Sequence, residues 1–257
     1  MKILAIDVGN TNTKFGVFSG LDLVHSDFAP TSRMLEASGW ESIWNRVTKN
    51  ADPALEISRI AYSIVVSELR SLLENWLSRH FPEIPVTSVC AGSYPFRIEY
   101  LTPETLGPDR LADALGGFRR YGGPLIVVDF GTAVTMNVID LAGNFLGGII
   151  APGSRLMARA LADGTSQLPT IHPEFPASPI GRSTQESIAS AVTYGLVELV
   201  DGMIERISKE LGTPIPAVAT GGNGKVITEL SKHITDYNPY LTLEGIVEFA
   251  RGAEGRP

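Results

Sequence analysis

The chain has 257 residues, of which 44% are hydrophobic and 19% charged, a composition typical of a folded globular protein and not of a disordered one. Its 28 acidic and 21 basic side chains give a net charge of −7 with no basic cluster, so nucleic acid and anionic membranes are poor partner candidates. The single cysteine excludes an intramolecular disulfide and a zinc–cysteine cluster, and the four scattered histidines lack the spacing of metal ligands. The N-terminus has no signal-peptide layout and no apolar run approaches the ~20 residues that span a bilayer, which predicts a cytoplasmic protein.

The first predicted element is a buried strand over residues 3–6 that ends at Asp7. A tight turn follows, and a strand over residues 15–18 folds back as a hairpin. Gly9 permits the turn to tighten or a ligand to approach, and short polar residues surround it, namely Asn10, Thr11, Asn12 and Thr13. Such a turn is either an ordinary hairpin turn or a concavity for phosphate oxygens, with Asp7 placed to hold the metal ion that accompanies phosphates.

The elements that follow alternate between strand and helix. The pattern predicts a third strand over residues 21–25, an irregular stretch over 26–37, a helix with Trp40 and Trp44 that ends near Asn50, a strand over 57–65, a helix capped by Ser67, and a strand over 86–89. Cys90 follows that strand, and we expect it to have a buried packing role. The alternation predicts α/β layers with an antiparallel hairpin at the start of each half.

Residues 100–110 contain two prolines and a glycine and open a helix. Asp109 at the start of that helix is either an N-cap or a functional acid, and the local sequence leaves both readings open.

A second hairpin repeats the first. Residues 126–133 match residues 4–11, since each apolar run ends in Asp-x-Gly with a small polar residue close behind, here Asp129, Gly131 and Thr132. This self-similarity predicts two related halves, which we divide between residues 117 and 118. If the halves face each other, both turns would hold one nucleotide from opposite sides.

The rest of the chain supplies connections and a long helix. Gly147 and Gly148 inside a predicted strand over 145–150 suggest that a backbone or ligand passes close by, and residues 163–183 form a proline-rich loop typical of a lid, a binding loop or an interface arm. A helix over 184–210 has an apolar stripe wide enough to serve a subunit contact as well as the core. A strand over 216–219 leads to Gly221 and Gly222, which form either a seat for adenine or ribose or a plain turn. A helix from Lys225, segments 240–243 and 244–251, and a frayed tail over 252–257 complete the chain.

With these motifs in order, the chain resembles the type III pantothenate kinases of bacteria, relatives of sugar and acetate kinases, actin and heat-shock chaperones. The most specific block is Tyr100…Pro103…Leu106-Gly107-Pro108-Asp109-Arg110, and it favours the functional reading of Asp109. The resemblance implies an α/β fold of two similar actin-like ATPase (ribonuclease H-like) domains, 1–117 and 118–257, each a mixed sheet flanked by helices.

The resemblance also implies ATP-dependent phosphorylation of pantothenate to 4'-phosphopantothenate, the first step of coenzyme A biosynthesis, by a homodimer. Asp109 would be the general base, and Asp129 would bind a monovalent cation, potassium or ammonium. The ATP site would comprise Asp7, Val8, Gly9, Asn10, Thr11, Asn12, Thr13 and Lys14, with Asp7 near Mg²⁺, together with Thr132. The pantothenate pocket would comprise Tyr100, Gly107, Pro108, Asp109, Arg110 and Thr184.

Three positions depart from the family pattern: Ser166 stands where alanine is usual, Ser183 where asparagine is expected and Ala191 where glycine is expected. They concern the acceptor pocket and helix packing. One alternative function is a kinase of another small hydroxyl or carboxylate substrate. Another is a transcription-accessory regulator of the same family without enzymatic activity, although the three acids in place favour an enzyme. A chaperone-like switch would need a large peptide-binding domain, for which the chain has no room.

Overall fold

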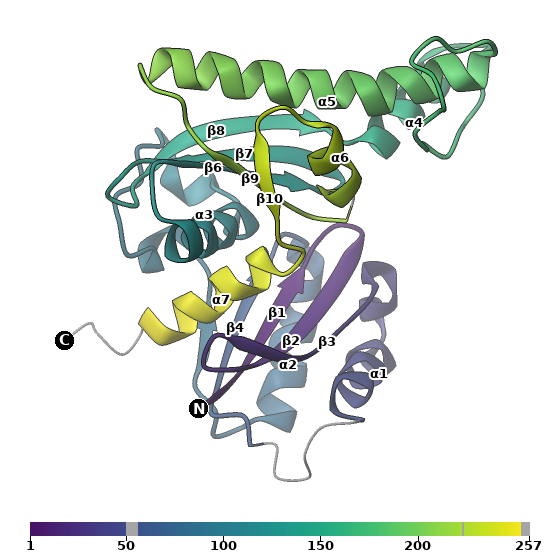
Figure 1. Ribbon diagram of the computed structural model, residues 1–257. Helices are drawn as coiled ribbons and strands as arrows, with labels where there is room; N and C mark the ends of the chain where they lie inside the picture. Colours follow the sequence, from purple (N-terminus) through teal and green to yellow (C-terminus); the bar gives the residue numbers. More distant parts are fainter. Residues whose placement is uncertain (50–55, 223, 253–257) are drawn as a thin grey trace. The chain divides into compact units, whose positions relative to one another are not determined.

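The computed structural model describes residues 1–49, 56–222 and 224–252, which form two compact units (Figure 1). Unit 1 consists of Met1–Gly122, Ala142–Leu146 and Tyr240–Pro257, and unit 2 of Gly123–Leu141 and Gly147–Pro239. Each unit contains a five-stranded sheet flanked by helices, which is the predicted fold class. The compact units interleave along the chain because the C-terminal helix packs in unit 1. The division of the chain into repeated halves at residue 117 stays a prediction.

Unit 1 is built on a mixed sheet with the strand order β3-β2-β1-β4-β5. Its strands are β1 (Lys2–Val8), β2 (Asn12–Ser19), β3 (Asp22–Pro30), β4 (Arg59–Ile64) and β5 (Val86–Ser88). Its helices are α1 (Ala37–Thr48), α2 (Arg70–His80), α3 (Pro108–Tyr121) and α7 (Leu241–Gly252), with short 3-10 turns η1 (Thr31–Leu35), η2 (Ser67–Leu69), η3 (Ala91–Ser93) and η4 (Pro103–Thr105). Figure 1 shows α1 and α2 on one side of this sheet and α7 on the other.

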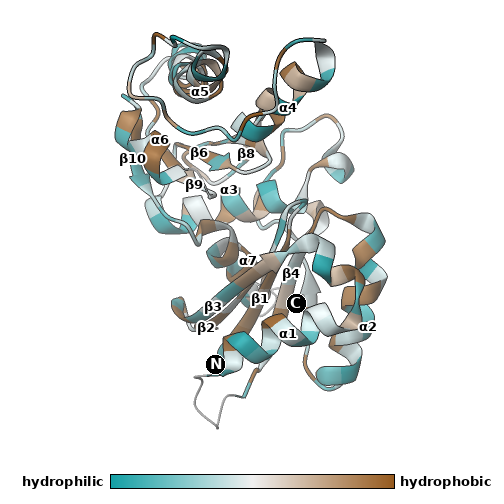
Figure 2. Cartoon of the chain, turned by 90° about the vertical axis from the view of Figure 1, so that its right-hand side faces the viewer, coloured by the Kyte–Doolittle hydropathy of each residue, from teal (hydrophilic) through white to brown (hydrophobic). Residues whose placement is uncertain are grey.

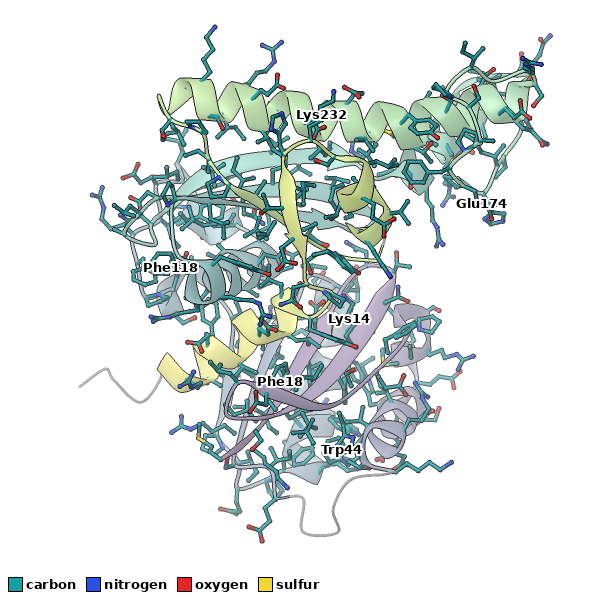
Figure 3. The ribbon with its side chains drawn as sticks, in the orientation of Figure 1. Lys14, Phe18, Trp44, Phe118, Glu174 and Lys232 are labelled. Atoms are coloured by element: carbon teal, nitrogen blue, oxygen red, sulfur yellow. The ribbon has the colours of Figure 1, made fainter. Side chains whose placement is uncertain are left out.

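The two faces of that sheet are covered differently. On one face an aromatic cluster joins the sheet to α1 and α2, where the ring of Phe15 lies 6.4 Å from that of Trp40 and 5.8 Å from that of Trp76. Trp44 packs partly buried at the edge of this cluster (Figure 3). On the other face α7 packs closely on α3, because Gly245 has no Cβ to collide with the backbone of Ala112. Figure 2 shows the hydrophobic strands β1 and β4 between helices of mixed polarity, as burial of both faces requires.

Unit 2 repeats this arrangement in the order β10-β9-β6-β7-β8. Its strands are β6 (Leu125–Phe130), β7 (Ala133–Ile139), β8 (Phe145–Pro152, whose first two residues belong to unit 1), β9 (Ala217–Thr220) and β10 (Ile234–Tyr237). Its helices are α4 (Ser154–Gly164), α5 (Thr184–Glu210) and α6 (Gly224–Leu230). In both sheets an antiparallel hairpin is joined on its other side by a parallel strand, so β1 corresponds to β6, β2 to β7 and β4 to β9. The structure therefore confirms the two related halves.

Helix α5 is long and apolar enough to be counted as a possible membrane span, the one such helix in the described part of the chain. Its buried side chains include Asp201, whose carboxylate accepts hydrogen bonds from the Ser231 hydroxyl and from the Lys232 backbone N–H before β10. These bonds tie α5 to the segment before β10 in unit 2, and the core helix of a globular unit passes the same test of length and hydropathy.

Several predicted details of the fold are wrong. Strand β3 continues to Pro30, so the stretch after residue 25 is not irregular. Ser67 does not cap α2, because its hydroxyl bonds to Glu68 and a 3-10 turn precedes the helix. No backbone passes close to Gly147, because no protein atom would lie within 4 Å of a Cβ added there; its φ of 136° favours glycine, and the approach of a ligand stays a prediction.

The prediction for Cys90 is also wrong. Strand β5 ends at Ser88, and Cys90 lies exposed before the turn η3, with its Sγ 3.4 Å from the Oγ of Ser93. Strand β10 was missed, and the segments 240–243 and 244–251 form one helix, α7. The predicted helix end at Asn50 and the tail beyond residue 252 lie outside the described residues.

Candidate active site

Asp7 stands near the end of the buried strand β1. Its register partners are Lys14 on β2 and Ser63 on β4, and side chains of directly paired residues project from the same face of a sheet. Asp7 is 8% exposed, and its Oδ1 atom accepts no hydrogen bond from the described residues. A buried carboxylate oxygen without a donor costs free energy, and a cation is one partner that would satisfy it. The site therefore fits a bound divalent ion.

The turn after Asp7 is held by hydrogen bonds. The N–H of Gly9 donates to the Asn12 carbonyl at 3.1 Å, and the Thr31 hydroxyl donates to the Gly9 carbonyl at 2.7 Å. Thr13 is fully buried with its hydroxyl 3.1 Å from that of Thr31, so its side chain supports the turn from inside. Asn10 and Thr11 are exposed at the tip. This arrangement leaves the tip residues, not Thr13, with side chains accessible to a ligand.

Asp109 lies in the first turn of α3, one residue after Pro108, and Gly107 occupies the N-cap position. Asp109 is therefore not the N-cap of this helix but an acidic residue of its first turn. Gly107 is needed here because an added Cβ would come 2.4 Å from the Oδ1 of Asp109. The Oδ1 of Asp109 accepts a hydrogen bond from the Arg110 backbone N–H at 2.9 Å.

The charge of Asp109 acts on the ionisation of Asp7. Burial raises the pKa of Asp7 from 3.8 to about 6, while the charge of Lys14 lowers this pKa and the charge of Asp109 raises it. Burial also raises the pKa of Asp109, an effect partly offset by the Arg110 N–H and charge. Asp109 is thus close enough for its charge to act on Asp7. A shifted pair of carboxylates of this kind marks a functional site.

Arg110 is 5% exposed, and its guanidinium lies 5.8 Å from the ring centre of Tyr100 and 5.5 Å from that of Phe145. The backbone of Phe145 bonds to the segment before Tyr100, since the Glu99 N–H donates to the Phe145 carbonyl at 2.7 Å. This contact positions one aromatic ring on the guanidinium. Stacked arginines of this type bind planar anions such as carboxylates.

Unit 2 carries the second Asp-x-Gly turn. Asp129 is near the end of β6, and its carboxylate lies against Gly221, whose added Cβ would come 2.3 Å from Oδ1. Gly221 has φ +86°, a conformation that favours glycine. Thr132 is exposed at the tip of the turn, and its carbonyl accepts a hydrogen bond from the Gly153 N–H at 3.0 Å. Thr184 is exposed at the first position of α5, after Ser183, which caps the helix by accepting from the Glu186 N–H.

Within each unit, the structure places some of the predicted site residues close together and others in separate elements. In unit 1 it brings together Asp7, Lys14 and Asp109, and it stacks Arg110 on Tyr100. In unit 2 Asp129 and Thr132 belong to one turn, whereas Thr184 begins a helix some fifty residues later in the chain. A cavity of about 430 Å³ in unit 1, lined by Arg119, Glu248 and Arg251 among others, contains none of the predicted site residues.

Sequence reasoning missed the residues that support this site through register or stacking, namely Thr31, Ser63, Thr135, Phe145 and Thr220. Their individual sequence contexts are ordinary. Alignment of the two Asp-x-Gly hairpins is the signal that would have found Thr135, since it fixes which residue of the returning strand lies opposite each acid.

Comparison with known proteins shows the family. The profile described as type III pantothenate kinase matches residues 3–206. A type III pantothenate kinase of Parafrankia sp. (strain EAN1pec) is 38% identical over 260 residues, covering 99% of this chain and 100% of its own. One of Anaeromyxobacter dehalogenans (strain 2CP-C) is 37% identical over 246 residues, covering 95% and 96%. The chain belongs to the type III pantothenate kinase family.

Solved structures agree on the fold alone, because their identities are low. A Campylobacter jejuni protein assigned to the Baf family of transcriptional activators aligns with a TM-score of 0.63 at 19% identity, covering 98% of this chain and 100% of its own. A ROK-family glucokinase of Streptomyces griseus, solved with glucose and AMPPNP, aligns with a TM-score of 0.57 at 12% identity, covering 98% and 99%. The fold is thus one shared with sugar kinases, and membership of the family rests on the sequence matches.

Proposed function

We propose that this chain transfers the γ-phosphoryl group of ATP to the primary hydroxyl of pantothenate, giving 4'-phosphopantothenate at the start of coenzyme A biosynthesis. Family membership over nearly the whole chain supports the reaction. The observation that carries the mechanism is the pair of acids in unit 1: Asp7 is buried with an oxygen that accepts no hydrogen bond from the described residues, and the charge of Asp109 raises the pKa of Asp7.

Asp109 is the general base in this proposal. As the acceptor hydroxyl oxygen bonds to the γ-phosphorus, its proton passes to the Asp109 carboxylate, and the bond to the β–γ bridging oxygen breaks to release ADP. Phosphoryl transfer has a loose transition state, so catalysis depends mainly on position and charge neutralisation. A base in reach contributes typically about 10²–10⁴-fold. A pKa raised by burial suits this acid to proton transfer nearer to neutral pH.

The turn from Asp7 to Lys14 would hold the ATP phosphates, with Lys14 as a fixed cation. Asp7 would be the protein ligand of Mg²⁺, which supplies positive charge to the phosphates when bound. Thr132 would contact ATP from its exposed position in unit 2. Val8 and Thr13 are buried, so their contribution would come through the shape of the turn.

The acceptor pocket would use the stacked Arg110 against the pantothenate carboxylate, beside Tyr100. Gly107 and Pro108 would shape its wall by setting the start of α3. Thr184 would contact pantothenate from the start of α5. Asp129 would bind the potassium or ammonium ion.

We also propose that the enzyme is a cytoplasmic homodimer. Three apolar side chains of α5, Leu199, Met203 and Ile207, are only partly buried and follow one another at four-residue steps. An apolar row left partly open on a long helix is a plausible subunit contact. Light scattering coupled to size-exclusion chromatography tests this: a mass near twice 27.6 kDa is expected, and a monomer would contradict it.

The function itself is tested by ADP release from ATP, Mg²⁺ and KCl with pantothenate, acetate, sugars or polyols as acceptor. Only pantothenate should stimulate release, with a product heavier by one phosphoryl group in mass spectrometry. The exposed-site variant Asp163→Asn serves as a control that should behave as the wild type. If another acceptor stimulated ADP release and pantothenate did not, that acceptor would be the substrate in place of pantothenate. If no acceptor stimulated release, the result would favour a regulator without enzymatic activity.

A further inference from the structure

The two hairpins can be compared position by position, because the sheets share one topology. In unit 1 the residues paired with Asp7 are Lys14 across the antiparallel hairpin and Ser63 on the parallel strand. In unit 2 the residues paired with Asp129 are Thr135 and Thr220 in the same two places. Directly paired side chains share a face of the sheet, so each acid has two neighbours on its own face.

The difference between the halves is one of charge. Lys14 gives Asp7 a cation fixed to the protein, and its charge lowers the pKa of Asp7. The equivalent position beside Asp129 is Thr135, which is neutral. A charged group that the fold supplies in unit 1 is therefore replaced by a hydroxyl in unit 2.

The two threonines beside Asp129 are buried without satisfied hydroxyls. Thr135 is 9% exposed and Thr220 is 0% exposed, and the Oγ1 atom of each has no hydrogen-bond partner among the described residues. A buried hydroxyl without a partner costs free energy, so two of them beside one carboxylate require an explanation. Oxygen atoms on both sides of an acid suit a hard cation, and a single carboxylate with neutral oxygens suits one of low charge.

We propose that Thr135 and Thr220 complete the monovalent-cation site of Asp129, and that Thr135, in the place that Lys14 holds in unit 1, makes the enzyme depend on an added cation. This inference rests on the proposed role of Asp129 as the cation ligand. Gly221 fits the same picture, because any side chain there would displace the Asp129 carboxylate from its position between the two threonine-bearing strands.

The first test measures cation binding without catalysis. The melting temperature of each purified variant is followed against KCl, with choline chloride at equal ionic strength as reference. The wild type should show a K⁺-specific rise, which Asp129→Asn should lose. Thr135→Val and Thr220→Val should each raise the KCl concentration at half effect at least about tenfold, since even outer partners of a bound ion typically change its affinity about 10–100-fold. Thr193→Val is the matched control, a buried threonine of unit 2 whose hydroxyl already donates to the Ala189 carbonyl.

The second test uses Thr135→Lys, which copies unit 1. This variant should lose the K⁺-specific melting shift, and its ADP release should no longer require K⁺. Should it fail to fold, the valine variants still decide. The inference is overturned if both valine variants keep the wild-type KCl midpoint, as they would if the hydroxyls merely hold a buried water, or if a folded Thr135→Lys remains K⁺-dependent. These melting results do not depend on the acceptor, so a failed pantothenate assay with an intact, threonine-dependent K⁺ shift would overturn only the proposed function.

Discussion

The raised pKa of Asp7 predicts that this residue weakens the unliganded fold. The relevant change is Asp7→Asn, which keeps the shape of the side chain and removes its charge, as protonation does. The folded-state pKa is about 6 and the ordinary value is 3.8, a difference of about 2.2 units. Because the folded chain holds this proton more tightly than the unfolded chain, the group's stabilising contribution is complete below pH 3.8 and is lost as the pH rises through about 6.

Each unit of pKa difference corresponds to 1.36 kcal/mol, so ionised Asp7 costs the unliganded fold about 3 kcal/mol at pH 8. Asp7→Asn should therefore raise the free energy of unfolding by about 3 kcal/mol at pH 8. At pH 5, where the wild-type side chain is largely protonated in the folded state, the gain should fall to about half of its value at pH 8. The gain in unfolding free energy is smaller at pH 5 than at pH 8. A change in packing would not depend on pH in this way.

The assay is urea unfolding at pH 8 and pH 5, without nucleotide or divalent metal, on the wild type and Asp7→Asn. The control is Asp163→Asn, which changes an aspartate whose side chain is 70% exposed. Activity with Mg²⁺ and ATP should fall while stability rises. The reasoning is refuted if Asp7→Asn is no more stable than the wild type at pH 8, or if its gain is the same at both pH values.

Three further outcomes test the base and the second turn. Asp109→Asn should lower kcat by about 10²–10⁴-fold while ATP affinity in an equilibrium titration is unchanged, and near-normal turnover would remove Asp109 as the base. Because burial raises the pKa of Asp109, the kcat of the wild type should fall on acidification at a pH above the range in which an ordinary carboxylate titrates. The same fall in the residual kcat of Asp109→Asn would show that another group causes it. Gly221→Ala should lower the free energy of unfolding by about 1–3 kcal/mol in urea melts, because the φ of Gly221 is +86° and an added Cβ would meet Asp129. The control is Gly222→Ala, which should leave the free energy of unfolding nearly unchanged because no atom lies within 4 Å of an added Cβ there. Equal effects of the two substitutions would contradict this.

The sequence alone predicts the local elements well because their signals are local. Both hairpins follow from an apolar run that ends in Asp-x-Gly, and the helix over 184–210 has the predicted bounds. The block that surrounds Asp109 predicts a function for this acid; the structure places Gly107, not Asp109, at the N-cap, and the function of Asp109 stays a prediction.

What the sequence does not predict depends on tertiary register. Ser63, Thr135 and Thr220 matter only because a strand distant in the chain sets each beside an acid. The strand pattern of residues 86–89 predicts a buried Cys90, but β5 is a short edge strand that ends before it. Nothing near Phe145 in the sequence indicates that its ring would lie over the guanidinium of Arg110.

The duplicated hairpin explains why the acids are retained at a cost to the fold. A carboxylate paired across the hairpin with Lys14 still has its pKa raised to about 6, because one fixed cation does not offset both burial and the charge of a second acid, Asp109 on α3. Unit 1 thus has Lys14 but two acids, Asp7 and Asp109. Unit 2 has the one acid Asp129, with Thr135 in the position equivalent to Lys14. Each half is left short of positive charge. Substrate-borne and added cations would supply that charge, so the residues that weaken the empty protein are those that would bind the ions of a phosphoryl-transfer reaction.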